Sequence, residues 1–192
     1  MEPRERLDQA GGEVLLKIAR SAITKRLGGS ETDSGTDFDV PARLLEPGGT
    51  FVTLTKKGSL RGCIGQIAGR EPLIEGVRRN ALNAAFEDPR FPPVQKDEWG
   101  GIRIEVSVLT DPAPLEYTDG DDLVGKLRQG VDGVIIRKGR HQATFLPQVW
   151  EQLPDTGKFL SHLCVKAGLL PDAWKSGDLE VSTYRVQAFE EP

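Results

Sequence analysis

The segment 48–67, GGTFVTLTKKGSLRGCIGQI, constrains the fold of this chain more than any other stretch. Segments rich in β-branched residues lie on both sides of Lys57-Gly58, a pair that favours a tight turn. The segment therefore predicts two neighbouring strands that run in opposite directions. The second of them carries Cys63 in the string Gly-Cys-Ile-Gly, two residues after an arginine. A cysteine that only fills space in a strand requires none of these neighbours.

A third strand is predicted over 102–110, because apolar and polar residues alternate there with a period of two. Glu105 and Ser107 share one face of this strand, and aliphatic side chains occupy the other. The polar face either meets water or lines a polar cleft.

The other elements follow from helical periodicity, caps and turn residues. Helices are predicted over 13–27, 71–86, 121–130 and 156–168, with Thr156 as the N-cap of the last; an exposed loop over 28–40; a hairpin over 131–147; and a final strand over 179–189. Strands and helices mix without a regular βαβ rhythm. We therefore expect an α+β fold with an antiparallel sheet flanked by helices.

Composition excludes some classes of protein. The length of 192 residues suits one domain, or one domain with a smaller lobe. A net charge of −4 disfavours a nucleic-acid partner. There is no long apolar run, and the charged N-terminus lacks the apolar region of a signal peptide, so we expect no membrane segment and a cytoplasmic location. Cys63 and Cys164 are then expected as free thiols, with Cys164 in the core.

Cys63 has two interpretations. In an unbroken strand, Arg61 and Cys63 point the same way with their Cα atoms ~6.5 Å apart, so the guanidinium would favour the nucleophilic thiolate. Gly62 and Gly65 would let a ligand or another part of the backbone come close. The competing interpretation is a core residue, because free cysteine is among the most buried residue types. The residues alone leave both open.

Three further polar residues are candidates for the same site. Asn80 lies on a helix face that is otherwise apolar, so its amide either anchors a loop or faces a ligand cleft. Asp88 and Arg90 flank a proline just after that helix, and they form either a surface ion pair or a ligand clamp. The two histidines are far apart and no CxxC pair exists, so no metal and no cofactor are expected.

Five strings occur in a familiar order: FVTLTKKGSLRGCIG, NALNAAFEDPRFPP, IEVSVLT, FLPQV and FLSHLCVKAGL. Over 13–189 the chain thereby resembles the AMMECR-domain family, whose bacterial members are called AmmeMemoRadiSam system protein A. The segment 150–159 departs from the Gly-Trp pattern of eukaryotic and archaeal members and looks closer to the bacterial form.

The resemblance implies a single AMMECR-type domain over 1–192 in two parts. The chain near both termini would form a larger subdomain, the middle of the chain a smaller one, and the signature 60–65 would line a cleft between them. The resemblance also implies two partners, a Memo-like protein and a radical SAM enzyme.

The leading hypothesis is an enzyme, or an enzyme component, that acts on a small molecule or a modified residue. Its predicted catalytic residues are Cys63 as nucleophile or redox thiol, Arg61 as electrostatic activator, and Glu105. Its predicted substrate-binding residues are Gly62, Gly65, Asn80, Asp88, Arg90 and Ser107. The alternative is a non-catalytic adaptor that docks those partners, and RNA binding comes third because of the negative net charge.

Overall fold

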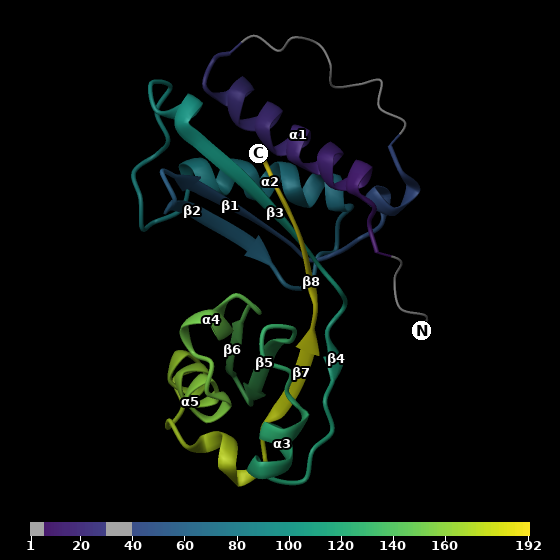
Figure 1. Cartoon of the computed structure of the whole chain (residues 1–192), viewed down its shortest axis with the longest axis vertical. Helices are drawn as coiled ribbons and strands as arrows, with labels where there is room; N and C mark the ends of the chain where they lie inside the picture. Colours follow the sequence, from purple (N-terminus) through teal and green to yellow (C-terminus); the bar gives the residue numbers. More distant parts are fainter. Residues whose placement is uncertain (1–5, 30–39) are drawn as a thin grey trace. The chain divides into compact units, whose positions relative to one another are not determined.

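A computed structural model describes residues 6–29 and 40–192. It shows an α+β protein, as predicted, with two four-stranded sheets (Figure 1). The chain divides into two compact units: unit 1 comprises 1–111 and 187–192, and unit 2 comprises 112–186. The predicted loop 28–40 lies for the most part outside the described residues.

The sheet of unit 1 contains the three strands that the sequence predicts. Its order is β2-β1-β3-β8, and β1 pairs antiparallel with both β2 and β3. At the β1–β2 turn, Lys57 and Gly58 both have positive φ, 53° and 77°, as a two-residue hairpin turn requires. The strands are β1 (Thr50–Lys56), β2 (Ser59–Gln66), β3 (Ile102–Leu109) and β8 (Val186–Glu190).

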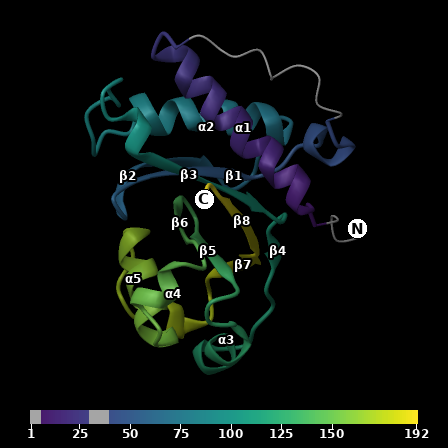
Figure 2. The same ribbon diagram turned by 45° about the horizontal axis from the view of Figure 1, so that its top comes forward.

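Two helices cover one face of this sheet, α1 (Gln9–Arg26) and α2 (Leu73–Phe86) (Figure 2). Their aliphatic stripes pack on the inward side chains of the strands, and this core includes Leu15, Val77, Leu54 and Ile104, all fully buried. Two short 3-10 turns complete the unit, η1 (Ala42–Leu45) and η2 (Trp99–Gly101).

The helix α1 begins four residues before the predicted start. The Asp8 carboxylate accepts a hydrogen bond from the Gly11 N–H (2.8 Å) and caps the helix. Gly12 is buried against the Phe189 ring, which a Cβ at position 12 would approach to 2.0 Å. The first turn of α1 thus carries glycines and no large apolar side chains, so the apolar pattern in the sequence begins after the helix does. This explains why the predicted start is four residues too late.

The end of the chain fastens β8 to unit 1. The Glu191 carboxylate binds the Arg20 side chain and accepts a hydrogen bond from the Ile104 N–H (2.9 Å), and the Glu191 N–H donates to the Ile104 carbonyl (3.0 Å). The Arg20 guanidinium lies over the Trp99 ring. These contacts join the first helix, the third strand and the last residues.

Unit 2 contains the second sheet, in the order β4-β7-β5-β6, and its own core around the stacked rings of Trp150 and Phe159. Cys164 is fully buried there, as predicted. The elements are β4 (Ala113–Pro114), α3 (Gly120–Lys126), β5 (Gly133–Lys138), β6 (His141–Phe145), α4 (Val149–Gln152), α5 (Thr156–Lys166), η3 (Ala173–Ser176) and β7 (Glu180–Tyr184).

Two predictions in this region are wrong in detail. The N-cap of α5 is Asp155, whose carboxylate accepts from the Lys158 N–H (2.7 Å), and Thr156 is the first helical residue. The final strand is interrupted at Arg185, because β7 belongs to the sheet of unit 2 and β8 to that of unit 1. Among the described residues, no helix has the length and apolar character that crossing a membrane requires.

Candidate functional site

Cys63 lies on the face of the first sheet that points away from α1 and α2. Its strand neighbour Gly62 is paired with the core residue Leu54, so Cys63 and its own partner Thr53 project to the opposite face. The Thr53 hydroxyl donates to the Cys63 sulfur at 3.4 Å. The thiol is partly exposed and free, which separates it from the buried Cys164.

Thr53 also pairs with Glu105 on β3, so three polar side chains form a row across three strands. We call Cys63, Thr53 and Glu105 the cross-strand row. Neighbouring strands lie about 4.8 Å apart, which places the Cα atoms at the two ends of the row about 10 Å apart. A small ligand can therefore reach both ends.

Glu105 is half-buried, and this changes its acid–base behaviour. Burial raises the pKa of the carboxyl, the hydrogen bond from the Ser107 hydroxyl (3.1 Å) opposes the rise, and the charge of Glu190 adds to it. The predicted pair Glu105 and Ser107 thus meets on the face that carries Cys63.

The two glycines of the signature contact other parts of the chain. A Cβ on Gly62 would lie 2.1 Å from the carbonyl oxygen of Ala84 in α2, so this glycine lets the helix backbone approach the strand. A Cβ on Gly65 would lie 2.2 Å from the Phe51 ring. A role of either glycine in substrate binding stays a prediction.

Arg61 occupies a β-bulge. Leu54 pairs with Gly62, but the next residue of β1, Thr55, pairs with Leu60, so Arg61 has no partner across the ladder. The prediction that Arg61 shares a face with Cys63 assumed an unbroken strand, and the bulge interrupts that alternation.

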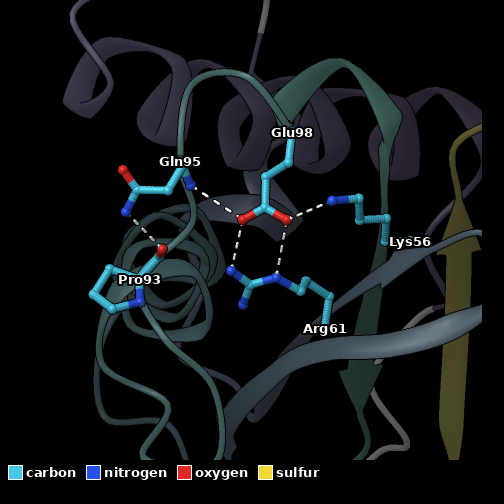
Figure 3. Close-up of polar contacts among 5 residues, drawn as sticks. All are labelled: Lys56, Arg61, Pro93, Gln95 and Glu98. Atoms are coloured by element: carbon cyan, nitrogen blue, oxygen red, sulfur yellow. Dashed lines mark hydrogen bonds and ion pairs between the residues drawn. The ribbon is translucent and has the colours of Figure 1, made fainter.

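The guanidinium of Arg61 binds the carboxylate of Glu98 through two hydrogen bonds, of 2.6 and 3.2 Å (Figure 3). The Lys56 ammonium (2.8 Å) and the Gln95 N–H (3.1 Å) bind the same carboxylate. Hydrogen bonds from Arg61 and then Lys56 lower the pKa of Glu98 to about 2. The buried Nη1 of Arg61 has no hydrogen-bond partner among the described residues.

Asp88 and Arg90 bracket the backbone of Cys63. The Asp88 carboxylate accepts from the Cys63 N–H (2.9 Å), and the Arg90 guanidinium donates to the Cys63 carbonyl (3.2 Å). Two further hydrogen bonds, of 2.9 and 2.7 Å, join the two side chains. The two side chains form an ion pair, one of the two predicted alternatives, and it is only partly at the surface because Asp88 is 4% exposed. A role as a ligand clamp stays a prediction.

This bracket also determines the charges around the thiol. The hydrogen bond from Arg90 holds the pKa of Asp88 far below its usual range. Asp88 is the main cause of the raised pKa of Arg90, and interaction with Cys63 contributes as well. Arg90, rather than Arg61, is thus the cation for which the structure shows an interaction with Cys63.

Asn80 lies on the helix-facing side of the sheet, apart from the cross-strand row. Its buried amide donates to the carbonyl (3.1 Å) and the hydroxyl (2.9 Å) of Thr50, which fixes α2 on β1. These contacts favour the anchoring role over contact with a ligand.

Comparison with known proteins places this chain in a family. The AMMECR1 family model matches residues 16–189. The chain belongs to the AMMECR1 family. A protein of Methanothermobacter thermautotrophicus is 43% identical and covers 96% of both chains, and one of Methanopyrus kandleri is 42% identical over 97% of this chain and 91% of its own. Both relatives are archaeal, and closeness to the bacterial form stays a prediction.

The fold of this AMMECR1 chain also matches a crystal structure. An uncharacterized protein from Pyrococcus horikoshii superposes with a TM-score of 0.85 at 37% identity, over 96% of this chain and 93% of that one. The match supports the α+β architecture described above.

Sequence reasoning on this AMMECR1 chain missed Thr53. Its position between the core residues Val52 and Leu54 indicates that it faces away from the helices, and this signal was available. That it lies beside Cys63 depends on the bulge at Arg61, which no local pattern shows.

Proposed function

We propose that this protein is an enzyme, or an enzyme component, in which Cys63 attacks an electrophilic carbon of a small molecule or a modified residue. The cross-strand row supports this proposal most directly, because a partly exposed thiol, a hydroxyl and a carboxyl with a raised pKa share one sheet face.

Each residue has a role in the proposed step. The Cys63 sulfur forms a bond to the electrophilic carbon, and the electron pair displaced from that carbon moves to a leaving atom or a carbonyl oxygen. Glu105 in its protonated form gives a proton to that atom. Thr53 holds the sulfur on this face, and Arg90 takes the role that the sequence analysis gave to Arg61, stabilising negative charge at the sulfur.

The remaining elements of the proposal come from the family resemblance. We propose that the protein works with a Memo-like protein and a radical SAM enzyme.

The test is the rate at which iodoacetamide alkylates Cys63 at neutral pH. The reference is a peptide of residues 59–66, which carries the same thiol without the fold. We expect the folded protein to react at least about tenfold faster, because thiols in electropositive, partly exposed sites are the reactive ones. A folded-state rate at or below that of the peptide would sink the proposed chemistry. Cys164, in the same digest, reports any unfolding.

An adaptor is the second candidate, and two exposed aliphatic residues favour it. Val165 is 56% exposed and Leu170 is 74% exposed, both near the C-terminal end of α5. The adaptor hypothesis expects co-elution with the purified Memo-like protein or radical SAM enzyme. Leu170→Glu should abolish co-elution, and Cys63→Ala should preserve it.

A further inference from the structure

We infer that the Cys63 site takes a negatively charged electrophile, which Arg90 binds through the part of its guanidinium that the protein leaves free. This inference rests on the proposed function and names the substrate class of the same site. Four observations carry it: the hydrogen bonds of Arg90, its exposure, the burial of its partner Asp88, and the different position of Arg61.

The hydrogen bonds of Arg90 occupy only one side of its guanidinium. Nε and Nη2 donate to the two oxygens of Asp88, at 2.9 and 2.7 Å, and Nη2 also donates to the Cys63 carbonyl. Within the described part of the chain, no hydrogen bond involves Nη1. Because the other two nitrogens are fixed, the direction of Nη1 is set before any ligand arrives.

The burial of the two partners is unequal. The Asp88 side chain is 2% exposed, whereas the Arg90 side chain is 53% exposed. The oxygens of Asp88 accept four hydrogen bonds, from the Cys63 N–H and from three nitrogens of Arg90. The negative charge is thus enclosed, and the positive charge is the one that solvent and a ligand meet.

Glu105, at the other end of the cross-strand row, repels a bound anion only weakly. Burial raises the pKa of Glu105, so this group is neutral over a wider pH range than an exposed glutamate. An anion bound at Arg90 lies beside Cys63, at the opposite end of the row from Glu105.

Arg61 does not offer the same contact. Its side chain is only 12% exposed, and two of its nitrogens are bound to Glu98, which is also enclosed. Nη1 of Arg61 also lacks a hydrogen-bond partner among the described residues, but it is buried, so of these two arginines Arg90 is the one whose unpaired nitrogen an anion in solvent can reach.

Two thiol reagents of similar size test the inference, because iodoacetate is negative and iodoacetamide is neutral. Both form an S–C bond at Cys63 and release iodide. We expect the ratio of the iodoacetate rate to the iodoacetamide rate to be about fivefold higher in the folded protein than in the 59–66 peptide, because contact between one cation and one anion at about 4 Å in a water-like medium contributes about 1 kcal/mol. A ratio equal to that of the peptide overturns the inference.

Variants assign the effect to Arg90. Arg90→Gln should return the ratio to the peptide value. Arg78→Gln is the matched control, because Arg78 is also an exposed arginine paired with a carboxylate, Glu75, but it lies on α2. The control should keep the wild-type ratio, and an equal fall in both variants would contradict a local contact.

Two further measurements apply if Arg90→Gln folds poorly. The double variant Asp88→Asn/Arg90→Gln removes both charges and keeps an acceptor for the Cys63 N–H, and it should show the peptide ratio. In the wild-type protein, added salt should lower the iodoacetate rate more than the iodoacetamide rate, because it screens the attraction of Arg90 to the charged reagent, whereas any effect on the thiolate is common to both reagents. A salt-independent ratio would contradict the inference.

The two proposals fail in different ways. A fast iodoacetamide reaction without preference for iodoacetate removes the anionic substrate and keeps the nucleophile. A slow iodoacetamide reaction removes the nucleophile itself.

Discussion

Two arginines, Arg61 in the strand β2 and Arg90 next to it, each bind a carboxylate from the loop that follows α2, but their side chains are buried to very different degrees. Arg61 and Glu98 are both largely enclosed, with 12% and 14% of their side chains exposed. In the other pair, Asp88 is enclosed and Arg90 is 53% exposed. The guanidinium groups of both arginines lie near the Phe91 ring, at 6.0 and 5.5 Å.

The difference shows how one kind of contact serves two purposes. Glu98 has two cationic partners and a backbone donor, so these contacts hold the loop against the strands β1 and β2. Asp88 has one cationic partner, and that partner reaches the Cys63 carbonyl. We therefore expect substitutions at the first pair to affect stability alone, and those at the second to affect stability and the thiol.

The largest expected effect is that of Arg90→Ala on stability. The substitution leaves the buried Asp88 carboxylate without its cation, which typically costs about 3 kcal/mol. Urea denaturation measures the change in the free energy of unfolding. In a double-mutant cycle, adding Asp88→Asn should restore part of the loss. A change below about 1 kcal/mol would indicate that water already solvates Asp88.

Arg61→Ala should cost less, about 1–2 kcal/mol, although Arg61 is the more buried arginine. Lys56 and the Gln95 N–H still bind Glu98 in this variant, so the carboxylate keeps partners. The same urea denaturation compares the two variants. If Arg61→Ala destabilises the protein more than Arg90→Ala does, then the number of partners that each carboxylate keeps does not determine the cost of losing its arginine.

The reaction of Cys63 separates the two arginines more sharply than stability does. Arg90→Gln should slow alkylation by iodoacetamide about fivefold, since a nearby cation no longer stabilises charge at the sulfur. Arg61→Gln should leave that rate within about twofold of wild type. Equal slowing in both variants would mean that Arg61 acts on the thiol despite the bulge.

The smallest expected effect concerns Glu105 and pH. Because burial raises the pKa of Glu105 in the folded state, the folded protein holds this proton more tightly than the unfolded chain does. Stability contributed by this group is therefore present below the unfolded pKa near ~4.3 and is lost as pH rises through the folded value.

Glu105→Gln should remove this loss. The variant should be as stable as wild type, or slightly less stable, near pH 4, and should gain relative to wild type as pH rises toward 7. Thermal denaturation at a series of pH values measures the difference. A difference that does not depend on pH would show that Glu105 is solvated like an ordinary surface carboxyl.

Local patterns in the sequence are sufficient to predict most of the helices and strands. The alternation over 102–109 and the turn at Lys57-Gly58 depend on neighbouring residues, so the sequence predicts them directly. The same turn, with an unbroken register, would pair Thr53 with Gly62. The bulge at Arg61 shifts the pairing by one residue and brings Thr53 opposite Cys63.

Features that depend on distant contacts were not predictable in this way. Arg61 binds Glu98, which lies 37 positions further along the chain, and the Asp88 bracket reaches back 25 positions to Cys63. The sequence shows that these residues are polar and close to prolines or glycines, but it does not show which cation meets which anion. The cap of α5 is a smaller case, because Asp155 and Thr156 are both good N-cap residues.

The position of β8 has a consequence for the order in which the protein can fold during synthesis. The outer edge of β3 receives its neighbour only when residues 186–190 have been made, whereas unit 2 ends at residue 186. Until then, the backbone donors and acceptors along that edge of β3 lack their strand partner, and Arg20 lacks Glu191. Residues 112–186 of unit 2 are therefore all made before residues 187–192 can complete the sheet of unit 1, although the first residues of unit 1 are made earlier.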